Sequence, residues 1–236
     1  FDTPIKHILK KILIFLDNFN SNKKFIVEKN TKIDGHKKAE YIIHNVKELS
    51  DSVYVQGNFE NYKYFEFCRD ELINILSIKS NLLDFNLPII NKLKDTNSIS
   101  IHIRANRYSD QINLTDNKEN FEKSKLFTNQ ILDYVNNGID FFKKKISTPK
   151  FFIWSNDFTN IEETLKNIKT DQYELVNTNN VISDFHLFKY SKNFIVGPSS
   201  FHWWGAWLNE NSDKICLRPS NLSPSNNDNF WPDDWI

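Results

Sequence analysis

The sequence predicts an α/β protein whose C-terminal half is built on a parallel sheet. From residue 98 to residue 218, short apolar runs alternate with segments of helical pattern, and five of these runs are strand-like. The first run, S-I-S-I-H-I-R at 98–104, alternates strictly, so that three isoleucines share one face and the polar residues, including His102 and Arg104, share the other. Strands that alternate with helices are typical of a parallel sheet covered by helices.

The expected elements of this half follow one another in regular order. Strands are expected at 98–104, 151–154, 173–176, 193–197 and 214–218. Helices are expected at 119–136, 157–168, 183–190 and 200–209. Ser183 is the expected N-cap of the third helix, because its hydroxyl can accept a hydrogen bond from the first free N–H groups. Trp203, Trp204 and Trp207 are expected in the core.

The N-terminal part is less regular and is predicted to be a separate region. A helix with a buried apolar stripe is expected at 5–19, and contact of its lysine face with a membrane surface is the alternative. Polar loops are expected at 20–38, and two short strands at 40–44 and 52–56. A helix is expected at 62–79, followed by a linker at 80–97 that contains Pro88. This pattern divides the chain into 1–97 and 98–236.

Composition excludes several classes of protein. Among 236 residues, 30 basic side chains balance 30 acidic ones, which argues against a nucleic-acid-binding protein or a polybasic membrane anchor. No stretch approaches the roughly 18 apolar residues of a spanning helix. Two cysteines, Cys68 and Cys216, make neither a disulfide framework nor a zinc cluster, and indicate a reducing compartment.

Other compositional features concern the origin of the chain. It begins at Phe1 and contains no Met, so we expect it to be a fragment. Abundant Lys, Asn and Ile suggest a bacterial, cytoplasmic protein. There are only four arginines, and in such a lysine-rich chain an arginine is expected where its fork geometry is needed.

His102 and Arg104 form the first candidate site. They lie at the carboxyl end of the first strand of the sheet, where open α/β sheets bind ligands. An arginine there can donate two hydrogen bonds to one phosphate. The alternative is an ion pair on the surface at the end of a strand.

The second candidate is G-P-S-S-F at 197–201, between a strand and a helix. Ser199 and Ser200 precede free N–H groups of the helix, which favour an anion. An ordinary helix cap is the alternative. Asp184 lies near the start of the preceding helix, where a carboxylate is stabilised by the helix dipole, or could accept N–H donors from a guanine edge.

Together these motifs resemble the α-1,2-fucosyltransferases of glycosyltransferase family 11. The similar segments are H-I-R at 102–104, S-N-D at 155–157, D-F-H-L-F-K-Y-S-K-N-F-I at 184–195 and P-S-S-F-H-W-W-G-A-W-L at 198–208. G-N-F-E-N-Y-K-Y-F at 57–65 and the ending F-W-P-D-D-W-I are also similar. The family's G-G-L-G-N-Q segment is not found, which agrees with the expectation of a fragment.

The resemblance implies a GT-B fold, with two Rossmann-like halves facing each other across a cleft. Residues 1–97 would be an incomplete acceptor-side region, and 98–236 would bind GDP-fucose. The implied reaction is inverting and metal-independent: L-fucose moves from GDP-fucose to the 2-hydroxyl of a galactoside in a surface glycan such as lipopolysaccharide. Neither a metal site nor a cofactor is expected, and the implied location is the cytoplasm, with peripheral contact to the inner membrane as an option.

The resemblance also implies roles for individual residues. Arg104 would bind the β-phosphate and stabilise the leaving diphosphate. His102 and Asp184 would contact the guanine or its ribose. The phosphates would lie against a short segment at the helix start: Ser199, Ser200 and Phe201.

Departures from the family pattern leave parts of this assignment open. Where the family has H-I-R-R-G-D-Y, this chain has Ala105 in place of the second arginine and Arg107 in place of the aspartate. Asp110 is the nearest replacement for that carboxylate as catalytic base, and Arg107 could restore a positive charge to the donor. His202 replaces a serine. The alternatives are another GDP-sugar transferase on the same fold, or a non-catalytic module that binds a sugar nucleotide or glycan.

Overall fold

The computed structural model describes eleven stretches of the chain: 11–13, 16–17, 23–27, 30–33, 36–39, 49–57, 59–77, 87–105, 117–159, 161–220 and 230–236. The chain forms two compact units, one of residues 1–66 with 225–230, the other of residues 67–224 with 231–236. The assignment of acceptor and donor roles to 1–97 and 98–236 stays a prediction.

The second unit contains the parallel sheet that the sequence predicts. Its five strands are β5 (Asn97–Ile103), β6 (Pro149–Ser155), β7 (Tyr173–Leu175), β8 (Asn193–Ile195) and β9 (Cys216–Leu217). Their spatial order is β7-β6-β5-β8-β9, and every neighbouring pair is parallel. The chain therefore moves outward from β5 to β7 and then returns to place β8 against the other side of β5. This reversal between β5 and β8 is the kind of switch point at which such sheets bind ligands.

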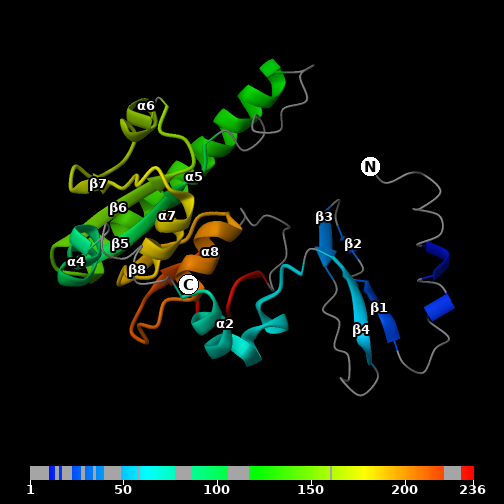
Figure 1. Ribbon diagram of the computed structural model, residues 1–236. Helices are drawn as coiled ribbons and strands as arrows, with labels where there is room; N and C mark the ends of the chain where they lie inside the picture. The colour runs from blue at the N-terminus through cyan, green and yellow to red at the C-terminus, as the bar shows by residue number, and fades with distance from the viewer. Residues whose placement is uncertain are drawn as a thin grey trace. The chain divides into compact units, whose positions relative to one another are not determined.

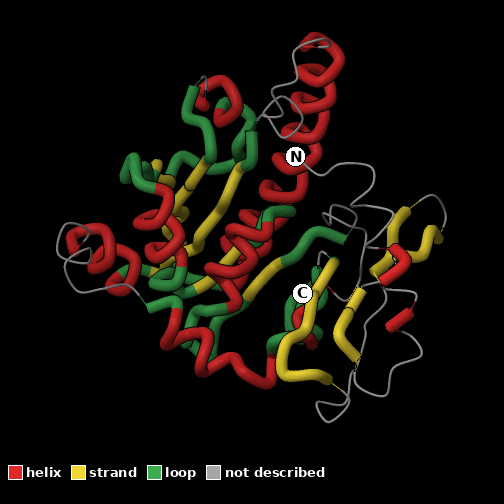
Figure 2. The backbone as a smooth tube through the Cα atoms, turned by 45° about the vertical axis from the view of Figure 1, so that its right-hand side comes forward, coloured by secondary structure: helices red, strands yellow, loops and turns green. Residues whose placement is uncertain are grey.

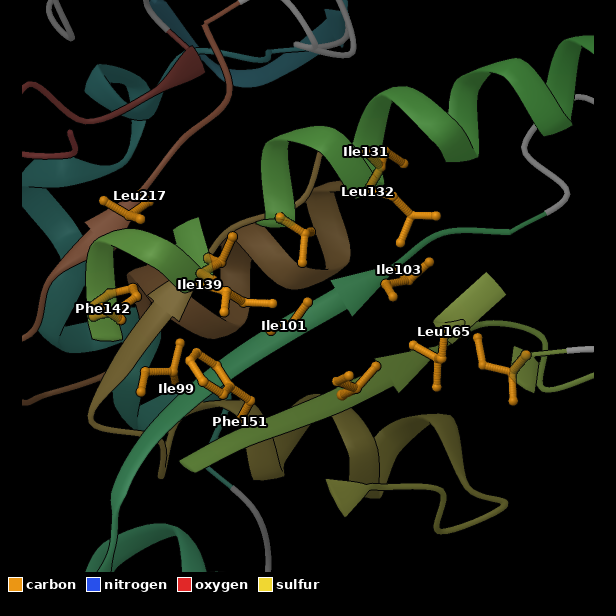
Figure 3. Close-up of a cluster of buried hydrophobic side chains, with 14 of the residues drawn as sticks. Ile99, Ile101, Ile103, Ile131, Leu132, Ile139, Phe142, Phe151, Leu165 and Leu217 are labelled. Carbon is orange, nitrogen blue, oxygen red and sulfur yellow. The ribbon is translucent and has the colours of Figure 1, made fainter. Parts of the chain in front are cut away.

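Helices cover both faces of this sheet (Figure 1, Figure 2). They are α4 (Leu87–Asp95), α5 (Asn117–Lys145), α6 (Ile161–Leu165), α7 (Val181–Phe188) and α8 (Ser200–Trp207). On one face, Ile99, Ile101 and Ile103 of β5 pack with α5 and α6 (Figure 3). On the other face, Phe152 and Trp154 of β6 pack with α4 and α7. Alternate side chains of a strand therefore pack against helices on opposite faces of the sheet.

The polar face of β5 is buried as completely as the apolar one. Ser98 and Ser100 are fully buried, and His102 is 5% exposed. Both serine hydroxyls have partners. Ser98 Oγ donates to the Leu93 carbonyl at 2.6 Å and accepts from the Lys192 N–H at 2.9 Å. Ser100 Oγ lies 3.1 Å from His202 Nε2. Because the hydroxyl groups of both serines are paired, this part of the face tolerates a covering layer of helices.

The structure corrects several expected boundaries in this unit. The predicted linker at 80–97 contains α4, which tolerates Pro88 because the proline lies in the first turn, where its missing N–H would have no helical partner. Helix α5 continues nine residues beyond the predicted end at 136, because Ile139 and Phe142 extend its buried stripe. Helix α6 is shorter than the predicted 157–168. Of the three tryptophans expected in the core, Trp203 and Trp207 are buried and Trp204 is half-buried.

The first unit contains short strands in a region expected to be loops. Strands β1 (Lys23–Val27) and β4 (Leu49–Gln56) pair in parallel, while β2 (Asn30–Ile33) and β3 (His36–Ala39) form an antiparallel pair. Strand β4 confirms the strand expected at 52–56 and begins earlier, at Leu49. The polar sequences of β2 and β3 give no strand pattern, which is why loops are expected there. The strand expected at 40–44 lies outside the described residues.

Two further helical predictions concern this end of the chain. The expected helix at 62–79 is three short pieces: η2 (Tyr62–Tyr64), η3 (Glu66–Cys68) and α2 (Arg69–Ile75). Of the helix expected at 5–19, the described residues Ile12, Leu13 and Leu16 are about half exposed, at 49%, 51% and 54%. The buried stripe predicted there is wrong at these positions. None of the helices in the described part of the chain has the length and apolar character needed to cross a bilayer.

Candidate nucleotide-sugar site

A cavity of about 560 Å³ opens at the carboxyl ends of the strands in the second unit. Its lining comes from the segments that follow β5, β6, β7 and β8, and includes His102, Arg104, Trp154, Asp184, Ser199 and Phe201. A second hollow of similar size, about 550 Å³, lies at the amino ends of the strands around Asn97, Pro149 and Tyr173. The first cavity lies at the switch point and is lined by side chains that the sequence motifs single out, among them His102, Arg104 and Asp184. It is therefore the candidate site.

His102 supplies a neutral imidazole to the cavity wall. Burial, together with the positive charge of Arg104, lowers the pKa of His102 to about 4. The ring lies between aromatic neighbours, with centroid distances of 6.0 Å to Phe188 and 6.1 Å to Phe201. At neutral pH this residue can donate and accept hydrogen bonds, but it carries no charge.

Arg104 supplies the positive charge of the cavity. It follows the last residue of β5, and the turn that carries it is fastened to the next strand by Asn156. The Ala105 N–H donates to Asn156 Oδ1 at 2.8 Å, and Asn156 Nδ2 donates to the Ala105 carbonyl at 3.1 Å. This reciprocal pair fixes the backbone beside the guanidinium, as a bidentate ligand for a phosphate requires.

Helix α8 begins beside the same cavity without a side-chain cap. Its N-cap residue, Ser199, is buried and lines the cavity, but its hydroxyl makes no capping hydrogen bond. The first N–H groups of a helix have no partner within the helix and carry a partial positive charge. An anion in the cavity can therefore be held by the N-terminus of α8 and by the Ser199 hydroxyl.

His202 holds the turn before α8 against β5. Its Nδ1 accepts from the Gly197 N–H at 3.2 Å, so its proton is on Nε2, which lies 3.1 Å from Ser100 Oγ. Burial lowers the pKa of His202 well below its usual value, and the nearby His102 adds to this. At Gly197, a Cβ would lie 2.7 Å from the His102 carbonyl oxygen. Only glycine allows β8 to approach β5 this closely at the switch point.

Asp184 lines the cavity as a half-buried carboxylate. Asn180, and not the predicted Ser183, is the N-cap of α7: its Oδ1 accepts from the N–H groups of Ile182 and Ser183 at 3.0 and 3.1 Å. Asp184 accepts instead from Thr178, at 2.8 Å from its hydroxyl and 3.2 Å from its N–H, both at Oδ1. Burial raises the pKa of Asp184 despite these hydrogen bonds.

The structure places the residues singled out in the sequence as follows. His102, Arg104, Asp184, Ser199 and Phe201 line one cavity, although they come from three separate parts of the sequence. Ser200 is the first residue of α8 and is exposed, and it does not line this cavity. Arg107 and Asp110 lie outside the described residues. What these residues bind remains a prediction.

Sequence reasoning missed three contributors to the site. Trp154 lines the cavity from the end of β6, Asn156 holds the Arg104 turn, and Asn180 caps α7. Asn156 stands within the S-N-D motif, so a signal for it was present. The other two depend on which neighbours the fold provides, and no local pattern distinguishes them from ordinary core or loop residues.

A parallel sheet with a polar cavity at its switch point, an arginine and an open helix N-terminus define an α/β domain with a candidate anion-binding site. The family described as Glycosyl transferase family 11 matches residues 2–236, so the chain belongs to this family of glycosyltransferases. No solved structure is significantly similar to the chain.

Two curated relatives are similar to it at modest identity. An alpha-1,2-colitosyltransferase of Escherichia coli is 27% identical over 174 residues, which are 73% of this chain and 57% of the relative. The O-antigen biosynthesis glycosyltransferase WbnK of Escherichia coli is 27% identical over 186 residues, 75% of this chain and 58% of the relative. The chain thus spans less than three fifths of the length of each relative.

Proposed function

We propose that this protein is a galactoside 2-α-L-fucosyltransferase that uses GDP-fucose and inverts the configuration at the fucose anomeric carbon. The observation that carries the proposal is the cavity itself, which brings His102, Arg104, Asp184 and Ser199 to the switch point of the sheet. The acceptor is a galactose-terminated glycan destined for the cell surface. The enzyme works in the cytoplasm, where nucleotide sugars are made, with peripheral contact to the inner membrane.

In this proposal the cavity binds the donor and stabilises the leaving group. The acceptor hydroxyl attacks the anomeric carbon, the sugar–phosphate bond breaks, its electron pair leaves with GDP, and the hydroxyl proton passes to a base. Arg104 and the N-terminus of α8 balance the charge that develops on the diphosphate. Because His102 is neutral, it contributes hydrogen bonds to the donor and no charge.

The base is assigned to Asp110, and Arg107 is assigned to the donor. Both assignments rest on the altered H-I-R motif, and both residues lie outside the described part of the chain. The metal-independence of the reaction is likewise part of the proposal, since Arg104 and α8 supply positive charge to the phosphates.

A second donor sugar is favoured by one of the relatives. The name of the E. coli alpha-1,2-colitosyltransferase assigns colitose to that protein, and colitose is therefore the second candidate for the transferred sugar. A non-catalytic sugar-nucleotide-binding module is the third possibility, motivated by Ala105 and Arg107 in the H-I-R motif.

The test is a transfer assay with purified protein and a panel of galactosides. GDP release that depends on acceptor, with a 2-linked β-to-α inverted product identified by NMR, supports the proposal. The fucose and colitose donors are compared in parallel, and a strong preference for colitose replaces fucose in the assignment. GDP binding without turnover on any galactoside contradicts the enzymatic assignment and favours the binding module.

A further inference from the structure

His202 lies in the first turn of α8, where this chain departs from the serine of the family pattern. Its side chain is fully buried, so it can act on the cavity only through its neighbours. Aromatic rings surround it, with centroid distances of 4.8 Å to Phe188, 5.7 Å to His102 and 6.2 Å to Phe194. A side chain packed on several sides keeps its two ring nitrogens at fixed positions.

The two nitrogens bond to different strands of the sheet. Nδ1 accepts from the Gly197 N–H at 3.2 Å, in the turn that follows β8, and Nε2 lies 3.1 Å from Ser100 Oγ of β5. Burial lowers the pKa of His202 well below its ordinary value, so the ring is neutral and Nδ1 keeps the lone pair that accepts this bond. One side chain thus joins α8, the turn and β5.

The hydrogen bond at Gly197 reaches the cavity through the backbone of the turn. The Gly197 carbonyl accepts from the Ser199 N–H at 2.7 Å, so this glycine is bonded to His202 on one side and to Ser199 on the other. Ser199 lines the cavity, and its carbonyl accepts from the Trp203 N–H at 3.0 Å in the first turn of α8. Gly197 itself has no side chain with which to anchor the turn. The orientation of the Ser199 hydroxyl and of the first N–H groups of α8 therefore depends on the bond that Nδ1 accepts.

We propose that His202 is a positioning residue for the phosphate groups of the donor. Its Nδ1 fixes the turn at 197–199, so that the Ser199 hydroxyl and the N-terminus of α8 face the phosphates. This inference rests on the proposed function and deepens it, because it assigns the affinity for the diphosphate in part to a residue that does not touch it. Serine has a single polar atom on a short side chain and cannot bond the turn and β5 through a ring as histidine does.

The experiment compares two substitutions that each keep one end of the ring. His202→Asn places its Oδ1 close to the position of Nδ1 and retains an acceptor for the Gly197 N–H. His202→Gln carries its amide one atom further, near the position of Nε2, and leaves no acceptor opposite Gly197. Ser98→Ala is the matched control, because it removes a buried hydroxyl of β5 that bonds the Leu93 carbonyl and the Lys192 N–H, outside the cavity.

Calorimetry measures the binding of GDP and of guanosine, which lacks the phosphates, to the wild type and to each variant. The wild type should bind GDP better than guanosine. His202→Gln should weaken GDP binding roughly five- to tenfold, the size of one hydrogen bond, and leave guanosine binding nearly unchanged. His202→Asn should keep most of the GDP affinity, and Ser98→Ala should lower the melting temperature without changing the ratio of the two affinities.

The other outcomes overturn the proposal in distinguishable ways. Wild-type GDP affinity in His202→Gln, or an equal loss for GDP and guanosine, shows a core residue only and leaves the proposed function standing. An equal, GDP-specific loss in both His202 variants shows that the bond to Gly197 is not the cause. A wild type that binds GDP no better than guanosine overturns both the positioning role and the proposed function.

A measurement on the wild type decides the question if a variant fails to fold, as thermal unfolding reports. In ¹⁵N NMR spectra, GDP should shift the Nδ1 resonance of His202, because an anion at the N-terminus of α8 polarises the bonded turn, and guanosine should not. A resonance that GDP leaves unmoved overturns the proposal.

Discussion

Replacing Gly197 with alanine tests whether the close approach of β8 to β5 builds the site. The new Cβ would lie 2.7 Å from the His102 carbonyl oxygen, whereas ordinary contacts begin near 3.4 Å. The opposing atom belongs to the backbone and cannot rotate away, so the strand ends must separate by most of the difference. That movement also stretches the hydrogen bond from the Gly197 N–H to His202 Nδ1, which is already 3.2 Å long.

The expected cost follows from these two effects. Overpacking against a fixed atom costs about 1–3 kcal/mol, and the weakened hydrogen bond adds about 0.5–1.5 kcal/mol. Alanine also lowers the conformational entropy of the unfolded chain relative to glycine, which offsets about 0.4–1 kcal/mol of this destabilisation. We therefore expect Gly197→Ala to lower the free energy of unfolding by about 2–3 kcal/mol, and to weaken GDP binding because Ser199 and His102 are displaced together.

Urea denaturation and calorimetry of GDP binding measure the two effects. Gly138→Ala is the control: its Cβ would meet the Ile195 side chain at 2.9 Å, on the opposite face of the sheet from the cavity. It should alter stability without altering GDP affinity. If Gly197→Ala keeps both the urea midpoint and the GDP affinity of the wild type, the close approach does not hold the site together, and the reasoning fails.

Three further predictions concern charge. Arg104→Ala should lower kcat/KM by roughly 10²- to 10³-fold, because it removes a charged contact with the leaving diphosphate. Its melting temperature should be unchanged, and Arg104→Lys should recover only part of the rate. A collapsed thermal transition in Arg104→Ala would contradict the placement of this residue beyond the strand end. Burial and Arg104 lower the pKa of His102 to about 4, whereas an unfolded histidine titrates at about 6.5. Between these two pH values the unfolded chain binds more protons than the folded one. The free energy of unfolding should therefore fall by roughly 3 kcal/mol as the pH drops through this window. Urea midpoints across this range should show a smaller slope in His102→Gln, and an equal slope in both proteins refutes the assignment. EDTA should leave the transfer rate unchanged; a loss that Mg²⁺ restores would show that Arg104 and α8 do not suffice for the diphosphate.

Much of the second unit could be predicted because its signals are local. The alternation at 98–104 depends only on neighbouring residues, and the five predicted strands and four predicted helices are all present, with altered ends. Errors arise where local signals mislead. Pro88 favours a linker in the sequence pattern but lies in the first turn of α4. Ser183 has a side chain suited to an N-cap, but Asn180 takes that position.

The grouping of the candidate residues could be predicted only in part. The carboxyl ends of parallel strands share one edge of a sheet, so residues that end or follow such strands, as His102 and Ser199 do, lie at the same edge. Their adjacency depends on the strand order, in which β8 returns beside β5. The role of Trp154 as a neighbour of His102 depends on the register of β6 against β5, which the sequence pattern does not fix.

The sequence by itself determined the alternation of strands and helices, the division of β5 into an apolar and a polar face, and the motifs that meet at the candidate site. Only the tertiary structure decided that the polar face is buried, and what each of its side chains contacts. Ser98 is satisfied by the N–H of a residue 94 positions away, and Ser100 by a histidine 102 positions away. Hydrogen bonds between residues so distant in the chain exist only once the sheet has assembled, because burial removes the water that would otherwise satisfy these groups and leaves the fold to supply the partner.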